Sequence, residues 1–135
     1  MANAVRRREF ITLAGGMAVW PIAAQAQRGE RVRRLSVLMG WNETDPQAKD
    51  ALSAFAEGLE KLGWVEGRNL RLDIRWTSGN ADLRQMFAKE LVELQPDVIL
   101  SNTTPVTAAL QRQTRTIPIV FVVVSDPVGS GFVTS

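Results

Sequence analysis

Asn69-Leu70-Arg71-Leu72-Asp73-Ile74-Arg75-Trp76 alternates strictly between apolar and charged residues from Leu70 onward. A period of two residues is typical of a β-strand whose two faces meet different surroundings. Because one of these faces is charged, we expect the strand to be half exposed and to lie near the edge of a sheet. An edge strand constrains where its neighbours lie, so the rest of the chain can be placed around it.

Three further strands are predicted, at residues 32–39, 97–100 and 118–124, and each contains a run that is apolar on both faces. Runs of this kind are typical of strands that are covered on both sides, as in a parallel sheet. The half-exposed strand at residues 69–76 therefore belongs outside the first strand. The expected spatial order is 2-1-3-4.

Three amphipathic helices are predicted between the strands, because apolar residues recur there at spacings of three and four. Asp45-Pro46 and Thr104-Pro105 each offer an N-cap followed by a first-turn proline, and Gly63 is expected to end the first helix. The apolar faces comprise Ala48, Ala51, Leu52, Phe55, Leu59 and Leu62, then Leu83, Met86, Phe87, Leu91 and Leu94, and finally Val106, Ala109 and Leu110. The order β-α-β-α-β-α-β predicts an α/β fold with a doubly wound parallel sheet and right-handed crossovers.

Residues 1–26 have the three parts of an export signal. A basic start is followed by an apolar stretch at residues 11–24, which is shorter than the roughly 20 residues of a membrane anchor. Small residues then precede an expected cleavage before Gln27. Arg7, Arg8 and Phe10 resemble the twin-arginine motif, which predicts the twin-arginine export machinery and signal peptidase as partners. A general secretory signal with a coincidental arginine pair is the alternative.

The net positive charge of the chain comes from this leader. Without its three arginines and Glu9, residues 27–135 contain 13 basic and 13 acidic residues, a balance that gives no electrostatic footprint for nucleic acid. The sequence contains neither Cys nor His. This composition removes disulfides, the thiol of a lipoprotein anchor, and the usual zinc and copper ligands. We therefore expect a soluble periplasmic product without a lipid anchor, metal or cofactor.

Ligands of open α/β sheets bind beyond the carboxyl ends of the strands. The candidate ligand-binding residues there are Gly40, Trp41, Asn102, Thr103, Thr104, Ser125 and Asp126. Their hydroxyls, amides, indole and single carboxylate suit a small polar or aromatic molecule. They contain no base paired with a nucleophile, and no dinucleotide or phosphate loop follows a strand, so no catalytic residue is predicted.

Several of these residues also have a purely structural interpretation. Thr104 is an expected helix cap, Trp41 can cover apolar surface, and Asn102 can brace its loop. Asp126 can shape a turn before Pro127 or serve as the counter-charge of a ligand ammonium. A helix that begins at Pro105 leaves free N–H groups where a ligand carboxylate can lie.

The chain from residue 32 onward resembles the amino-terminal lobe of a family of ABC-transporter substrate-binding proteins whose characterised members take up aromatic amino acids. The resemblance is carried by Gly58-Leu59, Leu62-Gly63-Trp64-Val65-Glu66-Gly67-Arg68-Asn69, Gly79-Asn80, Pro96-Asp97-Val98-Ile99-Leu100, Thr104-Pro105, Thr116-Ile117-Pro118-Ile119-Val120-Phe121 and Asp126-Pro127-Val128-Gly129. It implies the type I periplasmic-binding-protein fold, in which two α/β lobes close on a solute, and an ABC permease of the inner membrane as partner. It also implies that Thr104-Pro105 and Ser125-Asp126 line the cleft.

The same resemblance implies a protein more than twice as long, so residues 27–135 are expected to form an incomplete lobe that stops before the second one. One lobe offers one face of the cleft, and weak binding is expected. The fourth strand, apolar on both faces, is expected to be an exposed and association-prone edge. Two other functions remain open, a fragment of an exported α/β enzyme and a ligand-sensing module of the same fold.

Overall fold

The structure is a computed structural model in which residues 31–134 are described. The expected leader, with Arg7, Arg8, Phe10 and the cleavage before Gln27, lies outside the described residues. All the described helices and strands belong to one compact unit, Val32–Ser135. These elements are β1 (Arg33–Met39), α2 (Pro46–Lys61), β2 (Leu70–Trp76), α3 (Ala81–Glu93), β3 (Val98–Asn102), α4 (Thr104–Gln113) and β4 (Ile119–Val122).

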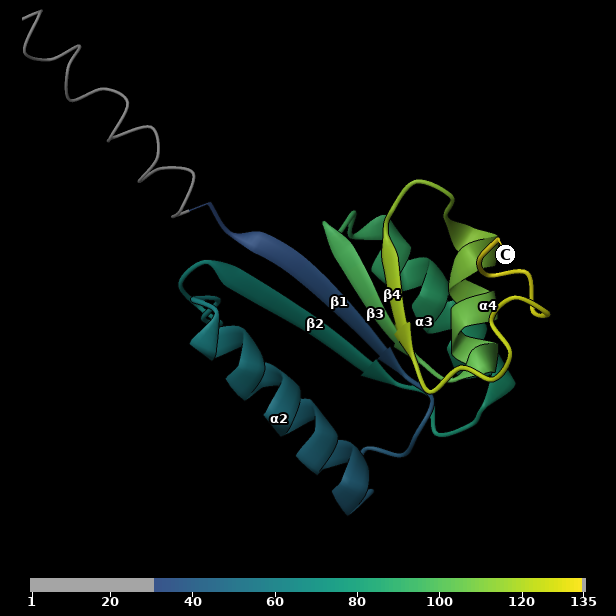
Figure 1. Cartoon of the computed structure of the whole chain (residues 1–135), viewed down its shortest axis with the longest axis horizontal. Helices are drawn as coiled ribbons and strands as arrows, with labels where there is room; N and C mark the ends of the chain where they lie inside the picture. The colour runs from purple at the N-terminus through teal and green to yellow at the C-terminus, as the bar shows by residue number, and fades with distance from the viewer. Residues whose placement is uncertain (1–30, 135) are drawn as a thin grey trace, which may run out of the picture. The chain divides into compact units, whose positions relative to one another are not determined.

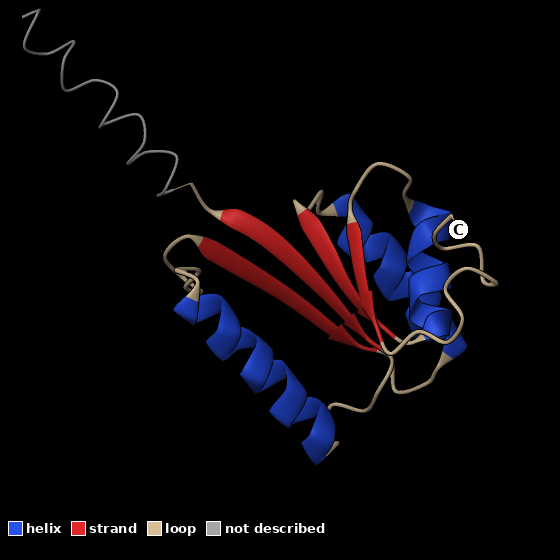
Figure 2. Cartoon of the chain, in the orientation of Figure 1, coloured by secondary structure: helices blue, strands red, loops and turns tan. Residues whose placement is uncertain are grey.

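The four strands form one parallel sheet in the order β2-β1-β3-β4, as predicted (Figure 2). Val37 at the centre of β1 lies opposite Ile74 of β2 and Leu100 of β3. All strands run in the same direction, so their carboxyl ends meet at one edge of the sheet. We refer to this edge, formed by the segments that come after the four strands, as the carboxyl edge.

The helices cover the two faces of the sheet unequally (Figure 1). On one face α2 packs over β1 and β2, in a core that includes Leu35, Val37 and Met39. On the other face α3 and α4 pack against a core that includes Leu38 and Ile99. Because the residues of β1 alternate between the two cores, the apolar run predicted to be covered on both faces is indeed covered on both.

Two of the three helices begin at side-chain caps. Asp45 caps α2 by accepting hydrogen bonds from the N–H groups of Gln47 and Ala48, which confirms the prediction from Asp45-Pro46. Asn80 caps α3 in the same way. Gly63 follows Leu62, the C-cap residue of α2, with φ 92°, a conformation that glycine adopts without the steric cost of a side chain.

Several expectations about the elements are wrong, among them the bounds of the third strand, which is Val98–Asn102 rather than residues 97–100. Thr104 is the first residue of α4 rather than its cap, and the N-cap position falls on Thr103. Leu62 and Met86, expected on buried helix faces, are 78% and 52% exposed, because one lies beyond the end of its helix and the other on the rim of the apolar face. The fourth strand ends at Val122 rather than at residue 124, since Val123 turns to φ 55°.

The charged face of β2 lies at the sheet edge as predicted, but its charges are paired rather than merely solvated. Asp73 accepts a 2.7 Å hydrogen bond from Nε of Arg34 on β1, and its side chain is only 11% exposed. Arg75 forms an ion pair of 2.7 Å with Glu90 on α3. These pairs join the edge strand to its neighbours on the α3 side of the sheet.

Candidate functional site

The segment after β1 lies at the centre of the carboxyl edge. Gly40 donates its N–H to Oδ1 of Asn102, at the end of the neighbouring strand β3, at 2.7 Å. A Cβ on Gly40 would lie 2.7 Å from Oγ1 of Thr103, closer than Cβ atoms approach in proteins, and 3.2 Å from Cγ2 of Val106, which is a tight contact. The start of α4 therefore packs directly against the backbone of this glycine.

Asn102 is almost fully buried, with 2% of its surface exposed. Its side-chain oxygen accepts the hydrogen bond from the N–H of Gly40. Asn102 thus braces its loop, which was one of the two roles expected for it. Its side chain also lines an apolar groove on the α2 face of the sheet. Asn102 thus joins the loops after β1 and β3.

The first turn of α4 is positioned by two threonines. Thr103 adopts φ 81° and makes no side-chain capping hydrogen bond, whereas its carbonyl oxygen accepts hydrogen bonds from the N–H and Oγ1 of Thr107. Oγ1 of Thr104 accepts a 3.1 Å hydrogen bond from the N–H of Ser125. The hydroxyl expected to cap the helix instead ties it to the segment after β4.

Trp41 and Asp126 are less central than the other candidates. The side chain of Trp41 is half-buried and packs against the core beneath α2, which is the structural role expected as one alternative. Asp126 is exposed, and its Oδ1 accepts a hydrogen bond from the N–H of Gly129 at 2.9 Å. That bond is the turn role that the sequence suggested for it. Of the seven candidates, Gly40, Asn102 and Thr103 form one contact group, and Thr104 and Ser125 another.

The loop after β2 completes the carboxyl edge, and none of its residues is among the seven candidates. Gly79 donates its N–H to the carbonyl of Gly40 at 2.9 Å, and Ser78 donates to that of Trp41 at 3.2 Å. Thr77 is buried and donates its hydroxyl to the carbonyl of Met39. The signal was present in Thr77-Ser78-Gly79-Asn80, a turn-forming string directly after a strand.

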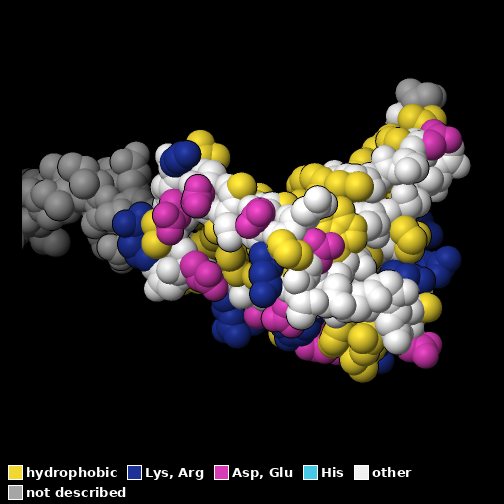
Figure 3. Space-filling view, turned by 90° about the horizontal axis from the view of Figure 1, so that it is seen from below, with side chains coloured by type: hydrophobic (Ala, Val, Ile, Leu, Met, Phe, Trp, Pro, Cys, Tyr) yellow, Lys and Arg dark blue, Asp and Glu magenta, His cyan; other side chains and the backbone are white. Residues whose placement is uncertain are grey.

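An apolar groove of about 290 Å³ lies beside the carboxyl edge on the α2 face. It continues past the part of the sheet that α2 covers, onto β3 and β4. Figure 3, which views the molecule from below, shows that hydrophobic side chains are exposed in patches between charged ones. The groove is lined by Met39, Trp41, Ala51, Leu52, Phe55, Leu100, Asn102, Val120, Val122 and Val123.

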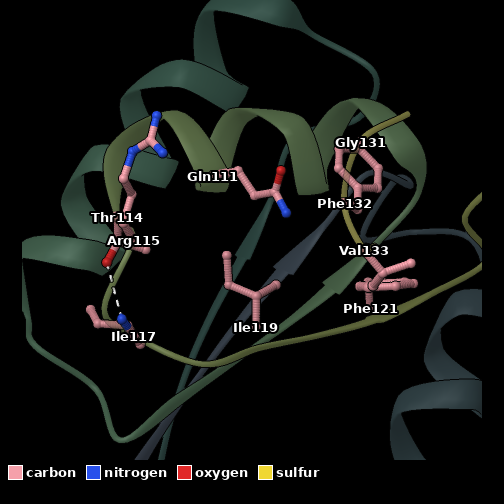
Figure 4. Close-up of a pocket in the computed structure, with 9 residues that line it drawn as sticks. All are labelled: Gln111, Thr114, Arg115, Ile117, Ile119, Phe121, Gly131, Phe132 and Val133. Carbon is pink, nitrogen blue, oxygen red and sulfur yellow. Dashed lines mark hydrogen bonds between the residues drawn. The ribbon is translucent and has the colours of Figure 1, made fainter. Parts of the chain in front are cut away.

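A second cavity, of about 580 Å³, lies between α4, β4 and the carboxyl-terminal segment after β4 (Figure 4). Phe121 and Phe132 approach there with their ring centroids 6.1 Å apart, and Oγ1 of Thr114 accepts a hydrogen bond from the N–H of Ile117. None of the seven candidate residues lines this cavity. This cavity is therefore lined by other residues than the candidate site at the carboxyl edge.

Membrane-spanning helices and metal-binding clusters are both missing from residues 31–134. No helix in this part of the chain has both the length and the apolar character needed to cross a membrane. No cluster of three or more His, Cys, Asp or Glu side chains there is arranged to hold a metal ion.

Comparison with known proteins identifies the family to which this fold belongs. Residues 44–135 match the model of the ABC transporter substrate binding protein family. The chain belongs to this family, as its resemblance in sequence indicated, and the proteins of the family are substrate-binding proteins rather than enzymes.

Individual relatives agree with this assignment. The chain is 31% identical over 90 residues to the tyrosine-binding protein of Clostridioides difficile (strain R20291), an alignment that covers 67% of this chain and 26% of the relative. It superposes on a conserved domain protein from Vibrio cholerae O1 biovar El Tor with a TM-score of 0.71 and 32% identity, covering 78% of this chain and 35% of the other. A ligand-free, open substrate-binding protein with adhesive properties from Clostridium difficile gives a TM-score of 0.71 at 27% identity, with 77% and 35% covered. The chain thus spans about a quarter to a third of the length of these relatives.

Proposed function

We propose that residues 27–135 form one face of the solute-binding cleft of an ABC uptake system, and that the solute is an aromatic amino acid. The observation that carries this proposal is the hydrogen-bonded carboxyl edge, where the loops after β1, β2 and β3 are joined through Gly40 and the loop after β4 is joined to α4. This chain captures a solute and carries out no catalysis. An ABC permease of the inner membrane receives the solute.

The start of α4 is the part of this edge suited to a carboxylate. Asp45 and Asn80 occupy the N–H groups at the starts of α2 and α3, whereas Thr103 leaves those of α4 without a side-chain cap. Unpaired N–H groups and the positive end of the helix dipole favour a negative charge. We assign the ligand carboxylate to this turn, between Gly40 and Thr104.

The aromatic part of the ligand is assigned to Trp41, whose half-buried indole borders the apolar groove next to this turn. The ligand ammonium is assigned to Asp126. The tyrosine-binding protein of Clostridioides difficile supports an aromatic amino acid as the solute, since such a ligand carries all three groups.

The mature chain is proposed to work in the periplasm after export by the twin-arginine route, through Arg7, Arg8 and Phe10, and cleavage by signal peptidase before Gln27. A solute-binding lobe needs to meet its solute outside the cytoplasm, which supports this location. The absence of cysteine from the sequence supports a product without a lipid anchor.

Nuclear magnetic resonance titration of ¹⁵N-labelled residues 27–135 tests the proposal at the level of single residues. Millimolar L-tryptophan is expected to shift the amide resonances of Gly40, Thr104 and Val106. Tryptamine, which has the ring and the ammonium but no carboxylate, is the matched control and is expected to leave Thr104 and Val106 unchanged. Equal shifts with both compounds, or shifts confined to residues remote from the carboxyl edge, would contradict the assignment.

A further inference from the structure

Thr103, the residue that precedes α4, has a backbone conformation that few residues other than glycine adopt. Its φ is 81° and its ψ is 152°, a region that glycine occupies almost alone. A β-branched side chain makes this conformation still less favourable. Strain of this kind persists only where the surrounding structure holds it in place. Contacts from other residues must therefore keep Thr103 in its conformation.

The conformation of Thr103 decides whether α4 has a side-chain cap. Threonine is a preferred N-cap residue, and Asp45 and Asn80 cap their helices at ordinary φ values of −68° and −78°. Thr103 makes no capping bond. Its side chain lies instead against Gly40, where an added Cβ would be 2.7 Å from Oγ1 of Thr103. The backbone conformation, rather than the residue type, thus leaves the first turn of α4 without a side-chain cap.

Two buried hydroxyls hold the carbonyl group of Thr103. Oγ1 of Thr107 donates a 2.9 Å hydrogen bond to this carbonyl oxygen, which also accepts one from the N–H of Thr107 at 3.2 Å. Oγ of Ser101 lies 2.7 Å from Oγ1 of Thr107, and both residues are fully buried. A hydroxyl has a single hydrogen to donate, and that of Thr107 goes to the carbonyl. Ser101 is therefore the donor to Thr107.

We propose that Thr107 and Ser101 are positioning residues for the ligand carboxylate, and that they act by holding Thr103 at positive φ. Buried hydrogen bonds that follow one another in a chain strengthen each other. The N–H of Thr103 is held as well, by the carbonyl of Val122 at 3.1 Å, so both backbone groups of the strained residue are fixed. This inference rests on the proposed function, because it concerns the turn to which the carboxylate is assigned.

Loss of the Thr107 hydroxyl is expected to let Thr103 relax to negative φ. The side chain of Thr103 is then placed to cap the first turn of α4, as Asp45 and Asn80 cap theirs. Pro105 has no N–H to offer, so the capped group is the N–H of Val106. A capped turn has fewer free donors for a carboxylate, and binding is expected to weaken.

The double variant Ser101→Ala, Thr107→Val tests this role without leaving a buried hydroxyl unpaired. A residue at positive φ brings its own N–H and Hα close together, which gives a strong nuclear Overhauser effect between them. In ¹⁵N-labelled residues 27–135, Thr103 is expected to show this strong effect and to lose it in the double variant. At a fixed subsaturating concentration of L-tryptophan, the shift of the Thr104 amide is expected to fall by about fivefold, within the contribution of a helix N-terminus.

Two controls separate positioning from stability. Thr107→Ser keeps the hydroxyl, and it is expected to retain both the strong effect at Thr103 and the shift of Thr104. Thr77→Val removes another buried threonine hydroxyl, whose Oγ1 and N–H also donate to a single carbonyl, that of Met39. This variant is expected to lower the thermal midpoint but to leave the nuclear Overhauser effect at Thr103 unchanged.

A weak effect at Thr103 in the unsubstituted chain, or a strong one that persists in the double variant, would overturn the proposal. A lost effect with an unchanged shift of Thr104 would overturn it too, because the conformation of Thr103 would then be irrelevant to the ligand. If L-tryptophan failed to shift Thr104 in the unsubstituted chain, the proposed function would be contradicted. The nuclear Overhauser effect would still decide whether Ser101 and Thr107 hold Thr103.

Discussion

The two edge strands of the sheet differ in how their outer surfaces are occupied. β2 carries Arg71, Asp73 and Arg75 on one face, and two of these residues form ion pairs with β1 and α3. β4 carries no charge at all, and half of its residues are exposed valines. Charged side chains protect an edge from further pairing, so within the described residues β2 has the features of a protected sheet edge and β4 does not.

The largest effect is expected from the protected edge. Asp73→Ala removes the partner of Arg34, whose guanidinium then lies partly buried without its counter-charge. Loss of a hydrogen bond to a charged group is expected to lower the free energy of unfolding by about 1.5–3 kcal/mol, measured by urea denaturation of residues 27–135.

Asp50→Ala is the control for this change, because Asp50 is exposed on α2 and such substitutions alter stability by no more than about 0.5 kcal/mol. If both variants lost the same small amount, the ion pairs of β2 would not hold that edge in place. The two edges would then differ only in the apolar character of β4, not in how firmly β2 is held.

A smaller effect is expected at Gly40, where the loops of both halves of the sheet are joined. Gly40→Ala places a methyl group against Thr103 and Val106 and is expected to cost about 1–3 kcal/mol of stability through overpacking. The matched control is Gly58→Ala in α2, where a Cβ meets nothing within 4 Å.

Gly58→Ala is expected to stabilise the chain by about 0.5–1 kcal/mol, because alanine is the better helix former. The two glycine substitutions should therefore change the thermal midpoint in opposite directions. A stabilising effect of Gly40→Ala would mean that the carboxyl edge is loose rather than packed.

The strand order could be predicted because it depends on local patterns. Alternating charge marked β2 as an edge, and apolar runs marked β1 and β3 as covered strands. The partners of individual polar groups could not be predicted in the same way. Thr104 meets Ser125 across 21 positions of sequence, and Asp73 meets Arg34 across 39, so only the folded chain shows that neither is a cap or a solvated charge.

The candidate site was predicted in part for the same reason. The topology rule located it at the carboxyl ends of the strands, and the structure brings Gly40, Asn102 and Thr103 into contact there. The role of Gly79 was missed because its hydrogen bond to Gly40 joins two loops that are distant in sequence. Composition alone carries no information about such a contact.

Calorimetric titration of residues 27–135 with L-tryptophan tests most directly the central claim that this chain offers one face of a two-sided cleft. A carboxylate at a helix N-terminus contributes about 0.3–2 kcal/mol, whereas micromolar affinity requires roughly 8 kcal/mol. The predicted result is a dissociation constant in the millimolar range or no measurable heat. Micromolar binding by this chain would contradict the claim, because one face would then suffice to hold the solute.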